Sequence, residues 1–174
     1  MGPDPVNRAP VSLALYQPDI PQNAGNLCRT AACFSVPVHV IEPCGFALSH
    51  AKMRRAGMDY MAHVEMHRHA SWSQFQADKP AGRIVLLTTK GEQNLPDFQF
   101  QTGDTLLLGR ESAGVPDDVH DSVDVRLMLP MTAGLRSMNV AVAGAITVFE
   151  ALRQLQGLPS PNILPEQDHA GDHE

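Results

Sequence analysis

The chain has 174 residues, of which 43% are hydrophobic and 18% are charged. This length and composition suit a single globular domain with a full core. No apolar run reaches the roughly 18 residues that a membrane-spanning helix needs. Residues 1–10 contain prolines and charges but no apolar segment typical of a secretory signal. We therefore expect a cytoplasmic protein. The three cysteines include no CxxC pair, which argues against both a disulfide framework and a structural zinc site.

The formal net charge of −6 is the wrong sign for a nucleic-acid-binding protein, but the charge is unevenly distributed. Residues 163–174 hold four acidic residues and no Lys or Arg, and without them the chain has 15 acidic and 13 basic residues. Residues 50–69 concentrate positive charge in Lys52, Arg54, Arg55 and Arg68. Such a patch is compatible with a phosphate partner. A solvated helix face explains it equally well.

Apolar and amphipathic segments alternate along the chain. In chain order, the pattern predicts a strand at 11–16, a helix at 21–34, a strand at 38–42, a helix at 49–56, a weak strand at 63–66, a helix at 71–77, strands at 83–88 and 105–108, a short helix at 116–120, a strand at 123–129 and a long helix at 137–156. Pro21 suits a first helical position and Ser137 a helix N-cap. The alternation predicts an α/β fold with a mostly parallel sheet covered by helices on both faces.

This fold occupies residues 11–157 as one domain. Residues 1–10 are expected to form a flexible N-terminus. Residues 158–174 are rich in proline and acidic side chains and almost without large apolar ones, so we expect a disordered tail.

Ligands of open α/β sheets bind beyond the carboxyl ends of the strands, and the first such end here is followed by PQNAGNLCR at 21–29. Asn26 and Arg29 are three residues apart and therefore neighbours on one helical face. Gly25 in the first turns costs about 1 kcal/mol relative to Ala, which suggests close approach by a ligand or another backbone. Alternatively, Arg29 is an ordinary surface arginine and Gly25 a tolerated defect.

Three further strand ends are polar or glycine-rich. Residues 87–91 read LTTKG, residues 108–116 read LGRESAGVP, and residues 129–141 contain LPM followed by RSMNVA. Glycines permit close backbone approach to a ligand, and Glu111 is placed to pair with a cationic ligand group or with Arg29. A plain β–α turn with a solvated Glu111 is the alternative. The small residues of the last helix are equally typical of ordinary core positions.

Other chemistries lack their motifs. The spacing of the glycines matches neither GxGxxG nor a P-loop, and QPDIPQN follows Tyr16 where a dinucleotide-binding oxidoreductase would carry its fingerprint. The sequence contains no GxSxG motif, so it gives no support for a hydrolase. His67, Arg68 and His69 superficially suggest a metal pair, but no carboxylate or cysteine lies at ligand spacing, so we expect a solvated loop and no metal.

Taken together, NAGNLCR at 23–29, LLLGRESAGVP at 106–116, and LPM with RSMNVA at 129–141 resemble the three ordered motifs of the SPOUT superfamily of RNA methyltransferases. The resemblance covers residues 11–156. Within this superfamily the sequence is most similar to the compact TrmL/YibK-like tRNA 2′-O-methyltransferases. The segments that carry this similarity are LYQPDIPQNAGN, IEPCGF, RRAGMDY and LTTKG. The resemblance implies a C-terminal deep trefoil knot, a homodimer, and S-adenosyl-L-methionine as cofactor.

The resemblance also implies a function. The expected substrate is the ribose 2′-hydroxyl of tRNA nucleotide 34, as cytidine or carboxymethylaminomethyluridine of leucine tRNAs. Another tRNA position, ribosomal RNA, or a non-catalytic RNA-binding protein of the same fold are the alternatives. The family's functional positions fall on Arg29, Asn26 and Glu111 for catalysis, and on Leu87, Gly109, Leu129, Ser137 and Met138 for the cofactor. Lys52, Arg54, Arg55 and Arg68 are the expected RNA contacts.

Two positions depart from the family pattern. Ala113 replaces a frequent Lys or Arg, and Phe149 replaces a frequent Tyr. The first substitution weakens a contact to RNA or to a partner subunit, and the second removes a hydroxyl near the dimer helix.

Overall fold

A computed structural model describes residues 9–47 and 63–160 of the chain. Its elements are β1 (Ser12–Tyr16), α1 (Pro21–Cys33), β2 (Val38–Ile41), β3 (Met66–His69), α3 (Trp72–Asp78), β4 (Ile84–Leu87), β5 (Gln93–Asn94), the 3-10 turn η3 (Leu95–Asp97), β6 (Thr105–Leu108), α4 (Asp117–Ser122), β7 (Val125–Met128) and α5 (Val140–Gln154). The predicted helix at 49–56, together with Lys52, Arg54 and Arg55, lies outside the described residues.

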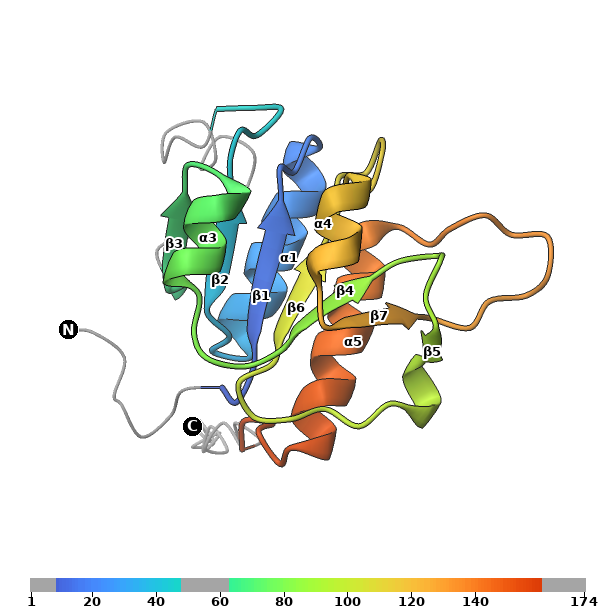
Figure 1. The fold of residues 1–174 in the computed structure, drawn as a ribbon. Helices are drawn as coiled ribbons and strands as arrows, with labels where there is room; N and C mark the ends of the chain where they lie inside the picture. The colour runs from blue at the N-terminus through green and yellow to red at the C-terminus, as the bar shows by residue number, and fades with distance from the viewer. Residues whose placement is uncertain (1–8, 48–62, 161–174) are drawn as a thin grey trace, which may run out of the picture.

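The strands form one sheet in the order β3-β2-β1-β6-β4-β7-β5, and every pair in it is parallel. Helices α1 and α5 cover one face, and α3 and α4 cover the other (Figure 1). Leu13 and Leu15 of β1 pack in the core cluster that contains α1 and α5 residues, whereas Ala14 and Tyr16 pack in the cluster on the α3 and α4 side. Continuous apolar strands are required because both faces are buried. The predicted parallel α/β sheet is confirmed, and the trefoil knot stays a prediction.

The structure corrects the prediction for the segment after residue 62. The weak strand expected at 63–66 is β3, at Met66–His69, so His67, Arg68 and His69 do not form a solvated loop. β3 pairs in register with β2, and buried His69 lies with its Nε2 3.0 Å from Nδ1 of His39. A polar strand is stable here because it is the last strand of the sheet and its inward histidine has a hydrogen-bond partner.

The start of α5 also differs from its prediction. Asn139, not Ser137, caps the helix, and its side-chain oxygen accepts hydrogen bonds from the backbone N–H groups of Ala141 and Val142. Residues 129–139 thus form a longer connection than expected. This connection begins at the carboxyl end of β7.

Phe75 anchors α3 on the sheet, and its removal is expected to destabilise the protein. The side chain is fully buried, and its ring centroid lies 5.3 Å from that of Trp72, 5.3 Å from His69 and 5.7 Å from His39. Phe75→Ala should lower the free energy of unfolding by about 3–5 kcal/mol because it leaves a cavity. Urea denaturation measures the change, with exposed Gln76→Ala as the control. A loss below about 1 kcal/mol would contradict the packing described here.

Candidate functional site

The carboxyl ends of β6, β4 and β7, which are neighbours in the sheet, meet around one cavity of about 620 Å³. We call it the loop cavity. Its wall is built mainly from residues 86–90, 108–115, 128–129, 131 and 137–140. All five predicted cofactor positions line it: Leu87, Gly109, Leu129, Ser137 and Met138. The fold therefore brings together residues that are up to 51 positions apart in the sequence.

The loop after β6 forms a tight hairpin against the cavity. The backbone N–H of Arg110 donates to the carbonyl of Gly114 at 3.0 Å, and the reverse bond measures 2.8 Å. Gly114 has a φ of +66°, which favours glycine. A Cβ on Gly109 would lie 2.7 Å from the carbonyl carbon and 2.8 Å from the Cα of Gly114. Both glycines are thus required by the way the loop folds back on itself.

A reciprocal pair of hydrogen bonds, which we call the Asp19 clasp, ties this loop to the segment before α1. The backbone N–H of Asp19 donates to Oε2 of Glu111, and the backbone N–H of Glu111 donates to Oδ1 of Asp19, both at 3.1 Å. Ser112 Oγ donates to the second oxygen of Asp19. Two loops 92 residues apart are held together in this way.

The clasp separates the pKa values of its two carboxyl groups. Hydrogen bonds from the side chains of Glu111 and Ser112 lower the pKa of Asp19 to about 2. Burial, together with the hydrogen bond to Asp19, raises the pKa of Glu111. Asp19 is therefore the stronger acid of the two.

Asn139 connects the loop cavity with α1. Besides capping α5, its side-chain amide donates to the side-chain oxygen of buried Asn23 on α1 at 3.1 Å. This bond fixes the chain that follows Ser137 and Met138 relative to α1. Loss of Asn139 would release both a helix cap and this inter-helix tie.

His120 lines the loop cavity from α4. Arg126 Nε lies 3.0 Å from the carbonyl oxygen of His120 and 3.3 Å from its Nδ1. Oδ1 of Asp121 lies 3.5 Å from the same Nδ1. Nε2 is buried and has no hydrogen-bond partner within the described part of the chain.

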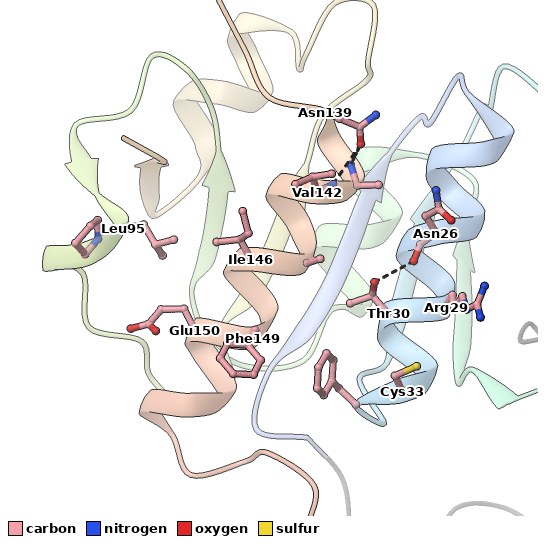
Figure 2. Close-up of a pocket in the computed structure, with 14 residues that line it drawn as sticks. Asn26, Arg29, Thr30, Cys33, Leu95, Asn139, Val142, Ile146, Phe149 and Glu150 are labelled. Atoms are coloured by element: carbon pink, nitrogen blue, oxygen red, sulfur yellow. Dashed lines mark hydrogen bonds between the residues drawn. The ribbon is translucent and has the colours of Figure 1, made fainter. Parts of the chain in front are cut away.

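A second hollow of about 1120 Å³, the α1–α5 groove, lies between α1 and α5 beside η3 (Figure 2). Figure 2 shows Asn26 and Arg29 on the α1 side. The α5 side presents exposed apolar side chains, with exposed fractions of 49% for Val142, 40% for Ile146 and 47% for Phe149. Asn139 lines both the groove and the loop cavity.

The predicted catalytic residues thus fall on two hollows. Asn26 and Arg29 line the α1–α5 groove, whereas Glu111 lines the loop cavity and is bound in the Asp19 clasp. Of the predicted RNA contacts, exposed Arg68 forms an ion pair with Glu42. Phe149, one of the two departures from the family pattern, lies in the groove with its ring 6.3 Å from that of Phe34.

Four residues of this region were not assigned a role from the sequence: Asn23, Arg110 and His120, which line the loop cavity, and Asp19, which is bonded to its wall. The QPDIP turn before α1 contains the one signal for Asp19, an acidic residue at a strand end. Asn23 and Arg110 lie inside the motifs at 23–29 and 106–116, but their contacts with Asn139 and Tyr16 depend on residues far away in the sequence. No group of three His, Cys, Asp or Glu side chains that could hold a metal occurs in residues 9–47 and 63–160. None of the helices in these ranges is long and apolar enough to cross a membrane.

A parallel α/β sheet with a cavity at the carboxyl ends of its strands defines the class of ligand-binding α/β proteins. Sequence comparison identifies the family. A profile of the SpoU rRNA Methylase family matches residues 10–149. The chain belongs to this family.

Named relatives are closely similar over most of their length. A protein of Ancylobacter novellus named tRNA (cytidine(34)-2′-O)-methyltransferase is 50% identical over 149 residues, which cover 84% of this chain and 94% of the relative. A protein of the same name from Beijerinckia indica is 51% identical, with 84% and 92% covered. A solved structure described as "Structural insights into the 2-OH methylation of C/U34 on tRNA" aligns with a TM-score of 0.79 and 45% identity, covering 84% of this chain and 97% of that one.

The Asp19 clasp is expected to give stability a specific pH dependence. The pKa of Asp19 is about 2 in the folded protein and returns to about 3.8 on unfolding. Its stabilising contribution is therefore complete above about pH 5 and is lost as the pH falls toward 2. Asp19→Asn should lower the free energy of unfolding at pH 7 by about 1 kcal/mol, and the difference from wild type should shrink between pH 5 and pH 2.

Urea unfolding at pH 7, 5, 4 and 3 measures this difference. Exposed Asp97→Asn serves as the control and should differ little from wild type across the range. A constant gap between wild type and Asp19→Asn down to pH 3 would contradict the clasp.

Proposed function

We propose that this protein transfers a methyl group from S-adenosyl-L-methionine to the ribose 2′-hydroxyl of nucleotide 34 of tRNA, in the cytoplasm. The expected nucleotides are cytidine and carboxymethylaminomethyluridine of leucine tRNAs. One observation carries the proposal: the five positions predicted for the cofactor surround a single cavity. The names of the relatives at 50% and 51% identity support the tRNA substrate and the wobble position.

The loop cavity has the properties that this cofactor requires. Its volume of about 620 Å³ is in the range of small-molecule sites. Leu87, Leu129 and Val140 supply apolar wall, and the hairpin from Gly109 to Gly114 allows a ligand to lie close to backbone. When bound, the cofactor would supply an electrophilic methyl group on a positively charged sulfur. Gly109, Ser137 and Met138 would hold it.

Arg29 is the residue we assign to the ribose. A guanidinium stays protonated and is a poor general base, but it stabilises a developing alkoxide and orients a neighbouring phosphate. Most of the rate enhancement would come from positioning the hydroxyl oxygen, which would form its bond to the methyl carbon as the sulfur–methyl bond breaks and would lose its proton to water. Asn26, one helical turn away on the same face of α1, shares the α1–α5 groove with Arg29. Glu111 would act as a positioning residue, because its bonds to Asp19 hold the loop after β6 against the segment that leads into α1.

The α1–α5 groove supports a homodimer. Three exposed apolar side chains of α5 and the half-buried Phe34, which caps the C-terminus of α1, line it. Such a surface is typical of an interface. A second copy seated in the groove would lie against Arg29, which would bring the partner's surface to the residue assigned to the ribose.

Binding of tRNA would use the basic residues Lys52, Arg54, Arg55 and Arg68. Arg68 is held by Glu42 and exposes 55% of its side chain, so it is available for a phosphate contact. The family description names ribosomal RNA, so ribosomal RNA is the second candidate substrate. Mass spectrometry of nucleosides separates the two.

The first prediction of this proposal concerns methyl transfer and Arg29. Purified protein, incubated with labelled cofactor and tRNA from a strain that lacks the gene, should form 2′-O-methylcytidine or 2′-O-methyluridine derivatives at position 34, detected by mass spectrometry. Arg29→Ala should reduce the rate at least about a hundredfold, as removal of an oxyanion-stabilising donor does elsewhere, and should leave cofactor affinity unchanged by calorimetry. Arg29→Lys retains the charge but not the planar guanidinium, so its rate should lie between those of wild type and Arg29→Ala.

Three results would contradict parts of this proposal separately. Methylation of ribosomal RNA alone would show that ribosomal RNA, and not tRNA, is the substrate. Full activity of Arg29→Ala with normal cofactor binding would show that Arg29 does not act on the ribose. If the wild-type protein did not bind the cofactor, the loop cavity would not be the cofactor site.

The homodimer yields a prediction of its own. Ile146→Asp places a charge in the middle of the α1–α5 groove and should shift the protein from dimer to monomer in sedimentation velocity, because an unpaired charge buried at an interface is strongly unfavourable. Ser73→Asp adds the same charge on exposed α3, on the other face of the sheet, and should not change the sedimentation coefficient. A monomeric wild-type protein, or an Ile146→Asp variant that remains dimeric, would rule out the groove as the interface.

A further inference from the structure

Arg110 in the wall of the loop cavity has a guanidinium without a hydrogen-bond partner. Its Nε is buried, and no acceptor in residues 9–47 and 63–160 takes a hydrogen bond from its side chain. The guanidinium carbon lies 5.8 Å from the ring centroid of Tyr16, which is itself buried at the end of β1. Arg110 is therefore held over an aromatic face, with its donors unused.

This arrangement is energetically unfavourable in the protein alone. A buried donor without an acceptor costs free energy, and native structures contain few of them. The nearby carboxylates do not compensate. Glu111 is bound in the Asp19 clasp, and Asp117 and Asp118 in the first turn of α4 accept nothing from Arg110. A contact between the guanidinium and the Tyr16 ring offsets part of the cost.

A comparison with Arg83 shows that the fold satisfies arginines elsewhere. Arg83 is also half-buried, and it donates from Nε and Nη2 to the two carboxylate oxygens of buried Asp104 at 2.9 and 2.8 Å. It donates a further bond to the carbonyl of Gln99. The Nε of Arg83 in the body of the domain is thus bonded to a carboxylate, whereas the buried Nε of Arg110 in the wall of the cavity has no acceptor within the described residues.

We propose that Arg110 binds an anionic oxygen group of the substrate complex, and that this group is a phosphate of the RNA beside the target ribose. The inference rests on the proposed function. The planar fork of arginine matches the oxygens of a phosphate and bonds them in pairs. Contacts to phosphate oxygens position the nucleic acid without reading its sequence.

Two features favour a phosphate of a large ligand. Ser112, Ala113 and Gly114, which complete the hairpin with Arg110, are all exposed, so an RNA chain can lie across this loop. Lys90, a second cation, lines the same cavity and is exposed as well. The carboxylate of the cofactor is the other source of the same chemistry, and binding measurements distinguish the two.

The experiment compares Arg110→Met and Arg110→Lys with wild type and with Lys79→Met. Lys79 follows α3 at the opposite edge of the sheet, where its ammonium donates to the carbonyls of Pro80 and Gly82. Its replacement also removes one positive charge. Affinity for a leucine tRNA transcript is measured between 50 and 200 mM salt, and affinity for S-adenosylhomocysteine by calorimetry. Scanning calorimetry gives the melting temperature of each free protein.

Arg110→Met should weaken tRNA binding about tenfold and reduce the slope of log affinity against log salt by about one. Arg110→Lys should restore the slope but only part of the affinity. Affinity for S-adenosylhomocysteine should stay within about twofold of wild type. Because the unpartnered donor is removed, the melting temperature of Arg110→Met should not fall, which separates a binding role from a structural one.

A tenfold loss of S-adenosylhomocysteine affinity with an unchanged salt slope would keep the anion site but make its ligand the carboxylate of the cofactor. The inference is overturned if Arg110→Met binds both ligands as Lys79→Met does. It is also overturned if both affinities fall together with the melting temperature. In either case a wild-type protein that binds both ligands leaves the proposed function intact, whereas a wild-type protein that binds neither removes both.

Discussion

The loop cavity depends on the parallel alignment of three neighbouring strands. β4 lies between β6 and β7, and Leu87 near its end pairs with Leu108 on one side and Leu127 on the other. Because parallel strands in register end at the same level, the segments that follow them leave the sheet together. The alignment is maintained by burial on both faces, since the leucines in the middle of these strands are fully or almost fully inaccessible to solvent. A change that shifted one strand would separate the groups that line the cavity.

Two long-range polar ties convert this shared edge into a site of fixed shape. The Asp19 clasp binds the loop after β6 to the segment that leads into α1, and the bond from Asn139 to Asn23 binds the start of α5 to the same helix. Helix α1 is thus fixed to two of the segments that form the loop cavity. It also carries Asn26 and Arg29 in the α1–α5 groove, so the position of these two residues depends on the same ties. Asn139, which borders both hollows, is the residue through which a disturbance of one would reach the other.

The sequence predicted what local pattern determines. VSLALY and TLLL are continuous apolar runs, and they form the buried strands β1 and β6 as expected. The predicted cofactor positions converge because the motifs follow strands that turn out to be neighbours. By contrast, β3 reads MHRH and has no apolar alternation, since it is stabilised by pairing with β2 and by the bond between His39 and His69. The two-residue strand β5 is too short for any period to appear. Asp19 and Glu111 are 92 residues apart, so the clasp follows only from the assembled fold.

The two arginines on the strands around the loop cavity differ in whether their Nε has an acceptor. The ion pair of Arg83 with buried Asp104 lies at the start of β4 and β6, away from both hollows, and Nε and Nη2 of Arg83 both donate to the carboxylate. At the other end of the same strands, Nε of Arg110 and Nε2 of His120 have no hydrogen-bond partner in the described ranges, and the pKa of Glu111 is raised by burial. Buried donors without an acceptor and carboxyl groups with a shifted pKa are expected at sites where a ligand supplies the missing partner. Because Tyr16 holds the guanidinium of Arg110, the donors of this side chain are already oriented in the free protein. Orientation before binding reduces the entropy that a ligand must lose there, so the same arrangement that costs stability in the free protein favours the complex.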